Sequence, residues 1–408
     1  MALTEKGRIA VNYIKEYYPT GKFTAKDLSA AAGEKIVAAT INGVVRNGLV
    51  KKIEGTSPVE YETVNDFLEL FETMIQEENS KGCTNTNLRK AAKVKNDEFY
   101  TRYEDIENEV MKYRKQFKDK IVYLPCDDPA EKKSEFWSFF VNNFDAFGLK
   151  KLIATHFDEN GKAYKIWIDN DLNNDGWIDD ADALQEDLEG NGDFRSEECV
   201  EILKECDIVC TNPPFSLFRE FVDLLMTHNK QFLIIGNKNA YAYKNIFTYF
   251  KNNAIWTGHT QPKDFRLEDG SITKKVNGLC RWFTNLSNSK RFEELILTKT
   301  YNENDYPYLD NYNAINVSRV VNIPKDFDGY MAVPITFMDK YNPEQFEIIG
   351  MGIAGLGLAA GVQPYKPEHK KYRKEIQKRG AVDGDLYMII KGEVVVPYAR
   401  ILIRKIKK

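Results

Sequence analysis

The sequence predicts an α/β fold built on a buried, mostly parallel sheet, and three observations support this expectation. Four short apolar runs rich in β-branched residues have the length of strands and occupy residues 121–124, 152–155, 208–211 and 232–235. Segments 135–144 and 218–226 lie between these runs and have helical patterns. Such alternation is typical of parallel strands joined by crossover helices. With 408 residues, 43% of them hydrophobic, the chain can bury a large core.

The first 64 residues have the pattern of a winged helix-turn-helix. Three short amphipathic helices are expected, over residues 5–17, 24–33 and 37–47. Thr24 is a suitable N-cap for the second helix, and Gly48 is a normal stop for the third. Segments 49–53 and 61–64 would then form the wing. This unit is expected either to read DNA or dock on a protein, or else to serve only for dimerisation or packing.

Charge and composition divide the rest of the chain. A helical linker is expected over residues 65–92, a catalytic core over 93–255, and the remainder of the core with a target-recognition region over 256–408. The net charge is −4, but acidic residues gather between 158 and 193, whereas the C-terminal stretch from residue 366 is basic. Local basic patches, rather than net charge, determine affinity for nucleic acid.

The chain also lacks several common signals. It has no run of eighteen apolar residues and no apolar segment at the N-terminus typical of a secretory signal, so we expect a cytoplasmic protein without a membrane span. Its six cysteines form no Cys-x-x-Cys pair, which implies neither a disulfide framework nor a zinc site. The segment 355–360 is expected to be a glycine-rich loop rather than a dinucleotide fingerprint.

The clearest chemical signal is the tetrapeptide Asn212-Pro213-Pro214-Phe215, which directly follows the apolar run 208–211. In open α/β sheets, ligands bind beyond the carboxyl ends of the strands, where this tetrapeptide would lie. The side-chain oxygen of Asn212 and the carbonyl of Pro213 can accept both N–H groups of an exocyclic amine and direct its lone pair outward. The prolines stiffen the loop, and Phe215 offers a face for an extruded base. An ordinary turn at the end of a strand is the alternative.

Together with four further segments, this tetrapeptide resembles the EcoRI-type adenine-specific DNA methyltransferases over roughly residues 93–408. Those segments are residues 95–101, 125–129, 193–194, and a C-terminal pair at 333–343 and 398–403. The resemblance implies a Rossmann-like, S-adenosylmethionine-dependent methyltransferase sheet followed by a C-terminal target-recognition region. It also implies that S-adenosylmethionine is the cofactor.

The resemblance further implies which residues contact the cofactor. These are Phe99, Tyr100 and Thr101 at its methionine end, Cys126, Asp127, Asp128 and Pro129 after the first strand, and Asp193 and Phe194 at its adenine. Residues 125–129 replace the glycine-rich loop of methyltransferases at large. Considered without the family, an acid at a strand end can bind a ribose hydroxyl or an ammonium group, or simply cap a helix.

Taken together, these features predict methylation of adenine N6 in double-stranded DNA, with the target base flipped into the loop at Asn212 and no catalytic metal. The enzyme would be sequence-specific, either beside a cognate restriction endonuclease or as an orphan methylase. Four alternatives stay open: methylation of RNA adenine, of cytosine N4 or of protein glutamine, and a non-catalytic DNA-binding regulator. The winged helix and the basic C-terminal region favour nucleic acid over protein.

A second motif resembles a calcium-binding loop. Asp171, Asn173, Asp175 and Asp182 have the spacing of its oxygen ligands, and Gly176 occupies the position of its turn glycine. The last ligand is Asp rather than the longer Glu, and no paired loop is evident. The segment therefore predicts either a structural Ca²⁺ site or a solvated acidic loop before Asp193.

Overall fold

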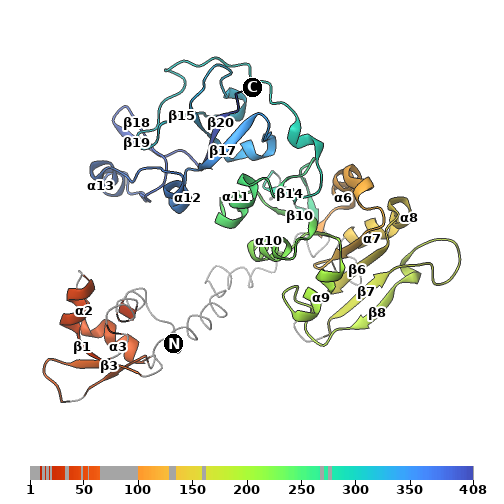
Figure 1. The fold of residues 1–408 in the computed structure, drawn as a ribbon, viewed down its shortest axis with the longest axis horizontal. Helices are drawn as coiled ribbons and strands as arrows, with labels where there is room; N and C mark the ends of the chain where they lie inside the picture. The colour runs from red at the N-terminus through yellow and green to blue at the C-terminus, as the bar shows by residue number, and fades with distance from the viewer. Residues whose placement is uncertain are drawn as a thin grey trace. The chain divides into compact units, whose positions relative to one another are not determined.

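The structure, a computed structural model, describes residues 10–11, 14, 18, 21–32, 36–46, 49–53, 55–64, 100–127, 135–158, 162–266, 271–273 and 278–407. They belong to two compact units, Met1–Asp97 and Glu98–Lys408 (Figure 1). Within the described part of the chain, no helix has both the length and the apolar character needed to cross a membrane. The finer division at residues 64, 92 and 255 stays a prediction.

The first unit contains a small antiparallel sheet and short helices. Its elements in chain order are β1 (Lys22–Thr24), α2 (Ala25–Ala32), α3 (Ala38–Arg46), β2 (Val50–Lys52) and β3 (Glu60–Thr63), with strand order β1-β3-β2. Thr24 and Asp27 bind each other's backbone N–H groups at 3.2 and 2.9 Å, which fixes the start of α2 as a capping box does. The assignment of this unit as a winged helix stays a prediction.

The second unit contains the large sheet. Among the described residues its order is β11-β14-β10-β9-β5-β6-β7-β8. In chain order the strands are β5 (Ile121–Leu124), β6 (Lys151–His156), β7 (Tyr164–Ile168), β8 (Leu184–Asp187), β9 (Ile208–Thr211), β10 (Gln231–Asn237), β11 (Trp256–Thr257) and β14 (Cys280–Thr284). The four central strands pair in parallel, and the sequence predicted all four. The expectation of an α/β fold with a large sheet is confirmed.

Helices cover both faces of this sheet. Successive residues of each strand point to opposite faces and so enter different cores. Tyr123 and Val209 lie in the core on the side of α9 (Glu197–Glu205), α10 (Phe218–Thr227) and α11 (Lys244–Lys251). Leu124 and Cys210 lie in the core on the side of α6 (Tyr103–Val110), α7 (Glu135–Asn142) and α8 (Phe144–Phe147). The prediction of one helix over residues 135–144 is wrong at its C-terminal end. The backbone of Asn143 leaves the helical region, and two helices form.

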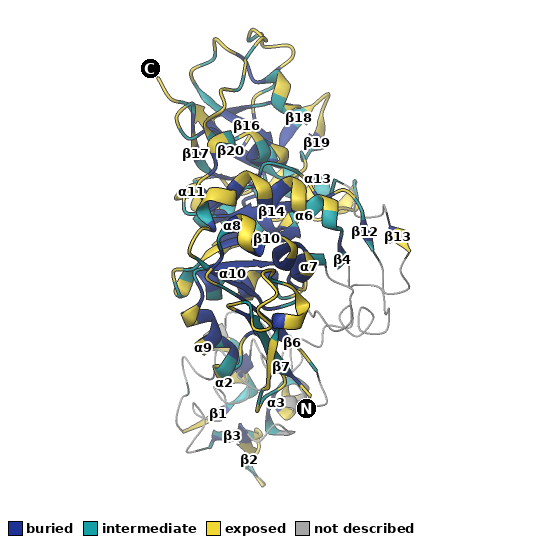
Figure 2. Cartoon of the chain, turned by 90° about the vertical axis from the view of Figure 1, so that its right-hand side faces the viewer, coloured by how far each residue is buried: buried dark blue, intermediate teal, exposed yellow. Residues whose placement is uncertain are grey.

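A second sheet lies in the C-terminal part of the same unit. Its order is β15-β16-β20-β17, from Ala314–Asn316, Tyr330–Pro334, Arg400–Lys405 and Phe346–Met351. Figures 1 and 2 both show it beyond α11 and β14, away from β6 and β7. The two sheets share one core, in which Ile234 and Phe283 of the large sheet belong to the same buried cluster as Met331 and Ile403.

Beside the C-terminal sheet lie α12 (Ala354–Ala359), α13 (Pro367–Glu375) and the hairpin of β18 (Met388–Ile390) and β19 (Glu393–Val395). The expectation of a glycine-rich loop at 355–360 is wrong, because this segment is mostly helix α12. Gly357 allows close packing, because a Cβ there would lie 1.9 Å from the carbonyl oxygen of Gly384.

Sequence reasoning also missed two groups of strands in the second unit. The acidic segment before Asp193, predicted as a loop, contains β7 and β8, which extend the large sheet as antiparallel strands. In addition, β4 (Tyr100–Thr101) pairs with β12 (Phe265–Arg266), which pairs with β13 (Ile272–Thr273). β7 has a sequence rich in aromatic and β-branched residues that sequence reasoning overlooked. β4, β8, β12 and β13 are short or exposed, and their pairing with other segments stabilises them.

Candidate active site

Several of the predicted site residues lie at one edge of the large sheet. Because β5, β6, β9 and β10 are parallel, their carboxyl ends share this edge. Cys126 and Asp127 follow β5, and the loop of Asn212 follows β9. Asp193 approaches the same edge because Gly192 permits a close contact: its φ is +75°, and a Cβ there would lie 2.2 Å from the carbonyl oxygen of His156 at the end of β6.

The loop from Asn212 to Phe215 joins the end of β9 to the start of α10. Thr211 and Pro213 are buried, Pro214 is exposed, and Phe215 packs at the border of the core. The carbonyl of Pro214 accepts the N–H of Leu217 at 3.0 Å, which leads the chain directly into α10. Asn212 itself is only partly buried, and it lies in a loop that the two prolines stiffen at the sheet edge.

A buried hydrogen bond connects the two loops. The hydroxyl of Thr211 donates to Oδ2 of Asp127 over 2.5 Å, and only 2% of Asp127 is exposed. Thr211 immediately precedes Asn212, while Asp127 follows β5. The carboxylate expected to contact the cofactor therefore also anchors the residue before Asn212.

The position of α10 depends on a glycine in β10. A Cβ on Gly236 would lie 2.3 Å from the ring of Phe218, the first residue of α10. The absence of a side chain at Gly236 lets this ring pack on the sheet, where it also contacts Phe283 at a centroid distance of 4.9 Å. This packing fixes the helix that follows the loop of Asn212.

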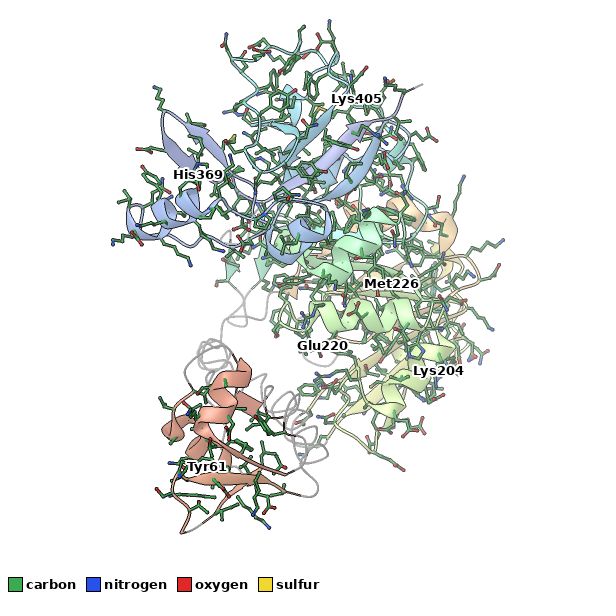
Figure 3. The ribbon with its side chains drawn as sticks, turned by 60° about the vertical axis from the view of Figure 1, so that its left-hand side comes forward. Tyr61, Lys204, Glu220, Met226, His369 and Lys405 are labelled. Carbon is green, nitrogen blue, oxygen red and sulfur yellow. The ribbon has the colours of Figure 1, made fainter. Side chains whose placement is uncertain are left out.

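Asp193 and Phe194 occupy different environments. Oδ2 of Asp193 lies 2.6 Å from a nitrogen of Arg195, and Oδ1 accepts the backbone N–H of Arg195 at 2.9 Å. These hydrogen bonds hold the pKa of Asp193 below its usual value. Arg195 also reaches Glu220 on α10, which Figure 3 labels. Phe194 is buried edge-on against Phe221 of α10, at a centroid distance of 5.0 Å.

Thr101 offers the most direct sign of a ligand. It lies on β4, only 2% of it is exposed, and its hydroxyl is buried without a hydrogen-bond partner in the described structure. A buried hydroxyl without a hydrogen-bond partner destabilises the folded state unless a ligand binds it. The resemblance assigns Thr101 to the methionine end of S-adenosylmethionine, whose ammonium and carboxylate groups can bind a hydroxyl. The residues present therefore fit this cofactor.

Other predicted cofactor residues are less informative. Tyr100 shares β4 with Thr101. Burial, reinforced by the neighbouring Asp127, raises the pKa of the Cys126 thiol, which stays neutral at physiological pH. Phe99, Asp128 and Pro129 lie outside the described residues.

The predicted calcium loop is ordered by its own backbone. Asp171 accepts N–H groups of Asn174 and Gly176, at 2.6 and 2.8 Å. Asp182 accepts N–H groups of Leu172 and Asp179, at 2.8 and 3.0 Å. Across the described ranges, no three His, Cys, Asp or Glu residues are grouped so that they could hold a metal ion. Calcium at Asp171, Asn173, Asp175 and Asp182 stays a prediction without structural support.

Sequence reasoning missed the residues that support the site rather than form it. Arg195 binds Asp193 and is itself bound by Glu220, while Gly192 and Gly236 permit close approaches. Arg195 stands two positions after Asp193, a spacing that a search for opposite charges would have found. The two glycines give no comparable signal, because the contacts that require them involve residues distant in the chain.

Comparison with known proteins gives a consistent result. Residues 87–406 match the model of the family described as adenine-specific methyltransferase EcoRI. The type II methyltransferase M.EcoRI of Escherichia coli is 43% identical over 296 residues, which cover 66% of this chain and 90% of that protein. The type II methyltransferase M.MpnI of Mycoplasma pneumoniae is 44% identical over 280 residues, covering 64% of this chain and 84% of its own length. No solved structure matches the chain.

Proposed function

This chain belongs to the EcoRI family of adenine-specific methyltransferases, and on that premise we propose that Asn212-Pro213-Pro214-Phe215 is its catalytic loop. The enzyme methylates adenine in DNA, as its family and relatives indicate. The observation that carries the assignment is the bond from Thr211 to Asp127, because it fixes the loop beside the segment expected to bind the cofactor.

Asn212 and Pro213 orient the target nitrogen. The lone pair of the adenine N6 amine is delocalised into the ring, so the amine is a poor nucleophile. The Asn212 Oδ1 and the Pro213 carbonyl accept its two N–H groups, which favours a pyramidal nitrogen with its lone pair directed toward the methyl donor. Because the prolines and Thr211 hold the loop in place beforehand, little reorganisation is needed. The excess proton then leaves to water.

Four described residues are proposed to hold the cofactor. Bound S-adenosylmethionine supplies an electrophilic methyl group on a sulfonium centre. The buried hydroxyl of Thr101 binds its methionine end, Asp193 accepts from its adenine amine, and Phe194 packs against the ring. Arg195 keeps Asp193 ionised and correctly oriented. Asp127 contributes by anchoring Thr211 as well as by contacting the cofactor.

The DNA is proposed to lie across the carboxyl edge of the large sheet, with the target base flipped toward Phe215. Flipping costs a few kcal/mol, which stacking and phosphate contacts offset. In the described part of α13, Lys371 and Lys374 are exposed and suit phosphate contact. We also propose that the first unit binds DNA or a protein, that a cognate restriction endonuclease exists, and that the enzyme is cytoplasmic.

The test is to incubate the purified protein with unmethylated bacterial genomic DNA and labelled S-adenosylmethionine, and then to identify the modified nucleosides by mass spectrometry. We expect N6-methyladenine. N4-methylcytosine would change the assigned base, and label found only in RNA or protein would refute DNA as the substrate.

A further inference from the structure

A cavity of about 250 Å³ lies between the large sheet and the C-terminal sheet. Asn239 reaches it from the segment after β10, Ile353 from the segment after β17, and Asp385, Pro397 and Tyr398 from the chain around the β18–β19 hairpin. Ligand pockets usually measure about 300–1,000 Å³. This cavity is therefore too small for a nucleotide or a cofactor, and it suits contact with the edge of one base.

The cavity lies close to the catalytic loop. Ile234 of β10 pairs with Thr211 of β9, and β10 continues three residues further, to Asn237. At a rise of about 3.3 Å per residue, Asn237 lies roughly 10 Å beyond the level of Thr211, and Asn239, where the cavity wall begins, follows two residues later. Bases along one DNA strand are about 3.4 Å apart. A base pair whose edge faces the cavity would therefore be a few steps from the target adenine.

Asp385 is the charged group in the cavity wall. Its Oδ1 accepts the N–H of Ala354 at 2.9 Å, which fixes the carboxylate at the start of α12. Among the described residues, no hydrogen bond reaches its Oδ2. The rest of the wall is mostly apolar, apart from the side chains of Asn239 and Tyr398. One fixed acceptor in an apolar wall suits a ligand that presents one N–H donor.

The major-groove edges of the four bases distinguish among possible occupants. Guanine presents only acceptors there and thymine an acceptor with a methyl group, so a carboxylate repels both. Adenine presents an amine beside the acceptor N7, whereas cytosine presents only its N4 amine. A carboxylate with one free oxygen therefore favours cytosine.

The surroundings of the cavity suit DNA. Tyr398 is 66% exposed and Tyr243 is 41% exposed, so both can contact bases or sugars. Lys244 is exposed on α11, and Lys238 lies between Asn237 and Asn239. Cations and exposed aromatic groups around a polar anchor are typical of surfaces that bind nucleic acid.

We propose that Asp385 is a specificity-determining residue, which accepts a hydrogen bond from the N4 amine of a cytosine a few base pairs from the target adenine. This inference rests on the proposed function and adds to it one element of target recognition.

The test is the substitution Asp385→Asn, whose remaining oxygen still accepts the Ala354 N–H while an amide N–H₂ replaces Oδ2. Wild type and variant methylate a DNA library with randomised positions around the modified adenine, and sequencing of the products gives relative kcat/KM for each base. We expect the wild type to prefer cytosine at one position, and the variant to lose about tenfold or more of that preference. Guanine or thymine should gain there.

Asp383→Asn is the matched control, because Asp383 instead binds Lys370 and the N–H of Tyr365. It should leave the base preferences unchanged. If the variant turns over too slowly to profile, equilibrium binding to duplexes with cytosine or thymine at that position gives the same comparison. Identical preferences in wild type and Asp385→Asn, with equal thermal stability, would overturn the inference alone. A wild type that methylates no adenine would instead refute the proposed function.

Discussion

Replacing Thr211 by Val tests the link between the two loops of the site. Valine has the shape of threonine but lacks the hydroxyl that donates to the buried carboxylate of Asp127 over 2.5 Å. Hydrogen bonds to charged groups contribute about 1.5–3 kcal/mol, and a buried acceptor that loses its donor bears a similar cost. We therefore expect Thr211→Val to lower the free energy of unfolding by about 1.5–3 kcal/mol.

Thr211→Val should also slow catalysis by more than the loss of stability alone would cause. Thr211 precedes Asn212, so a relaxed strand end displaces the acceptors that orient the adenine amine. A misplacement of about 1 Å can cost on the order of 10²-fold in rate. Urea denaturation gives the unfolding free energy, and single-turnover methylation of a DNA duplex gives the rate.

Thr284→Val is the matched control. Thr284 is also fully buried, and its hydroxyl donates to the carbonyl of Phe232 over 2.6 Å at the opposite edge of the sheet. It should lose stability while keeping the single-turnover rate. If Thr211→Val had the wild-type rate and an unfolding free energy within about 0.5 kcal/mol of wild type, the anchoring role of Thr211 would be wrong.

Three further changes test other parts of the structure. Gly236→Ala should destabilise the enzyme by about 1–3 kcal/mol and reduce turnover, because the added Cβ overlaps the ring of Phe218; an unchanged melting curve would contradict this packing. Arg281→Leu should cost about 3–5 kcal/mol in urea denaturation, because it leaves the carboxylate of Asp339 without its buried partner; a neutral effect would show that Asp339 rehydrates. Burial raises the pKa of Glu109 above its ordinary 4.5, so the folded state binds this proton more tightly and stability falls as pH rises from 4.5 through the raised pKa. The unfolding free energy of wild type minus that of Glu109→Gln should therefore decrease across this window, and a constant difference would exclude the effect.

The central part of the fold could be predicted because its signals are local. The four parallel strands are apolar runs, and the helices between them have clear amphipathic patterns. The loop of Asn212 could also be located, since it directly follows the run that forms β9. The expectation that its residues and those after β5 lie at one sheet edge follows from parallel pairing.

The remaining elements depend on contacts between distant segments. β4 is two residues long and forms because Phe265 and Arg266 pair with it. β8 is exposed on both faces, so its sequence has no apolar alternation to detect. The hydrogen bond from Thr211 to Asp127 joins residues 84 positions apart, and the sequence gives no sign that they are partners. Such partners are determined by tertiary packing, which intrinsic propensity does not encode.

The most direct test of the catalytic assignment is the single-turnover rate of Asn212→Ala, measured together with its affinity for S-adenosylmethionine. Removing one preorganised hydrogen-bonding group from an active site typically costs about 10²–10³-fold in rate. We expect a loss of at least that size with cofactor affinity within a few-fold of wild type, because the described cofactor residues lie on other segments. A variant that methylates adenine at nearly the wild-type rate would contradict the assignment of Asn212 as the residue that orients the target amine.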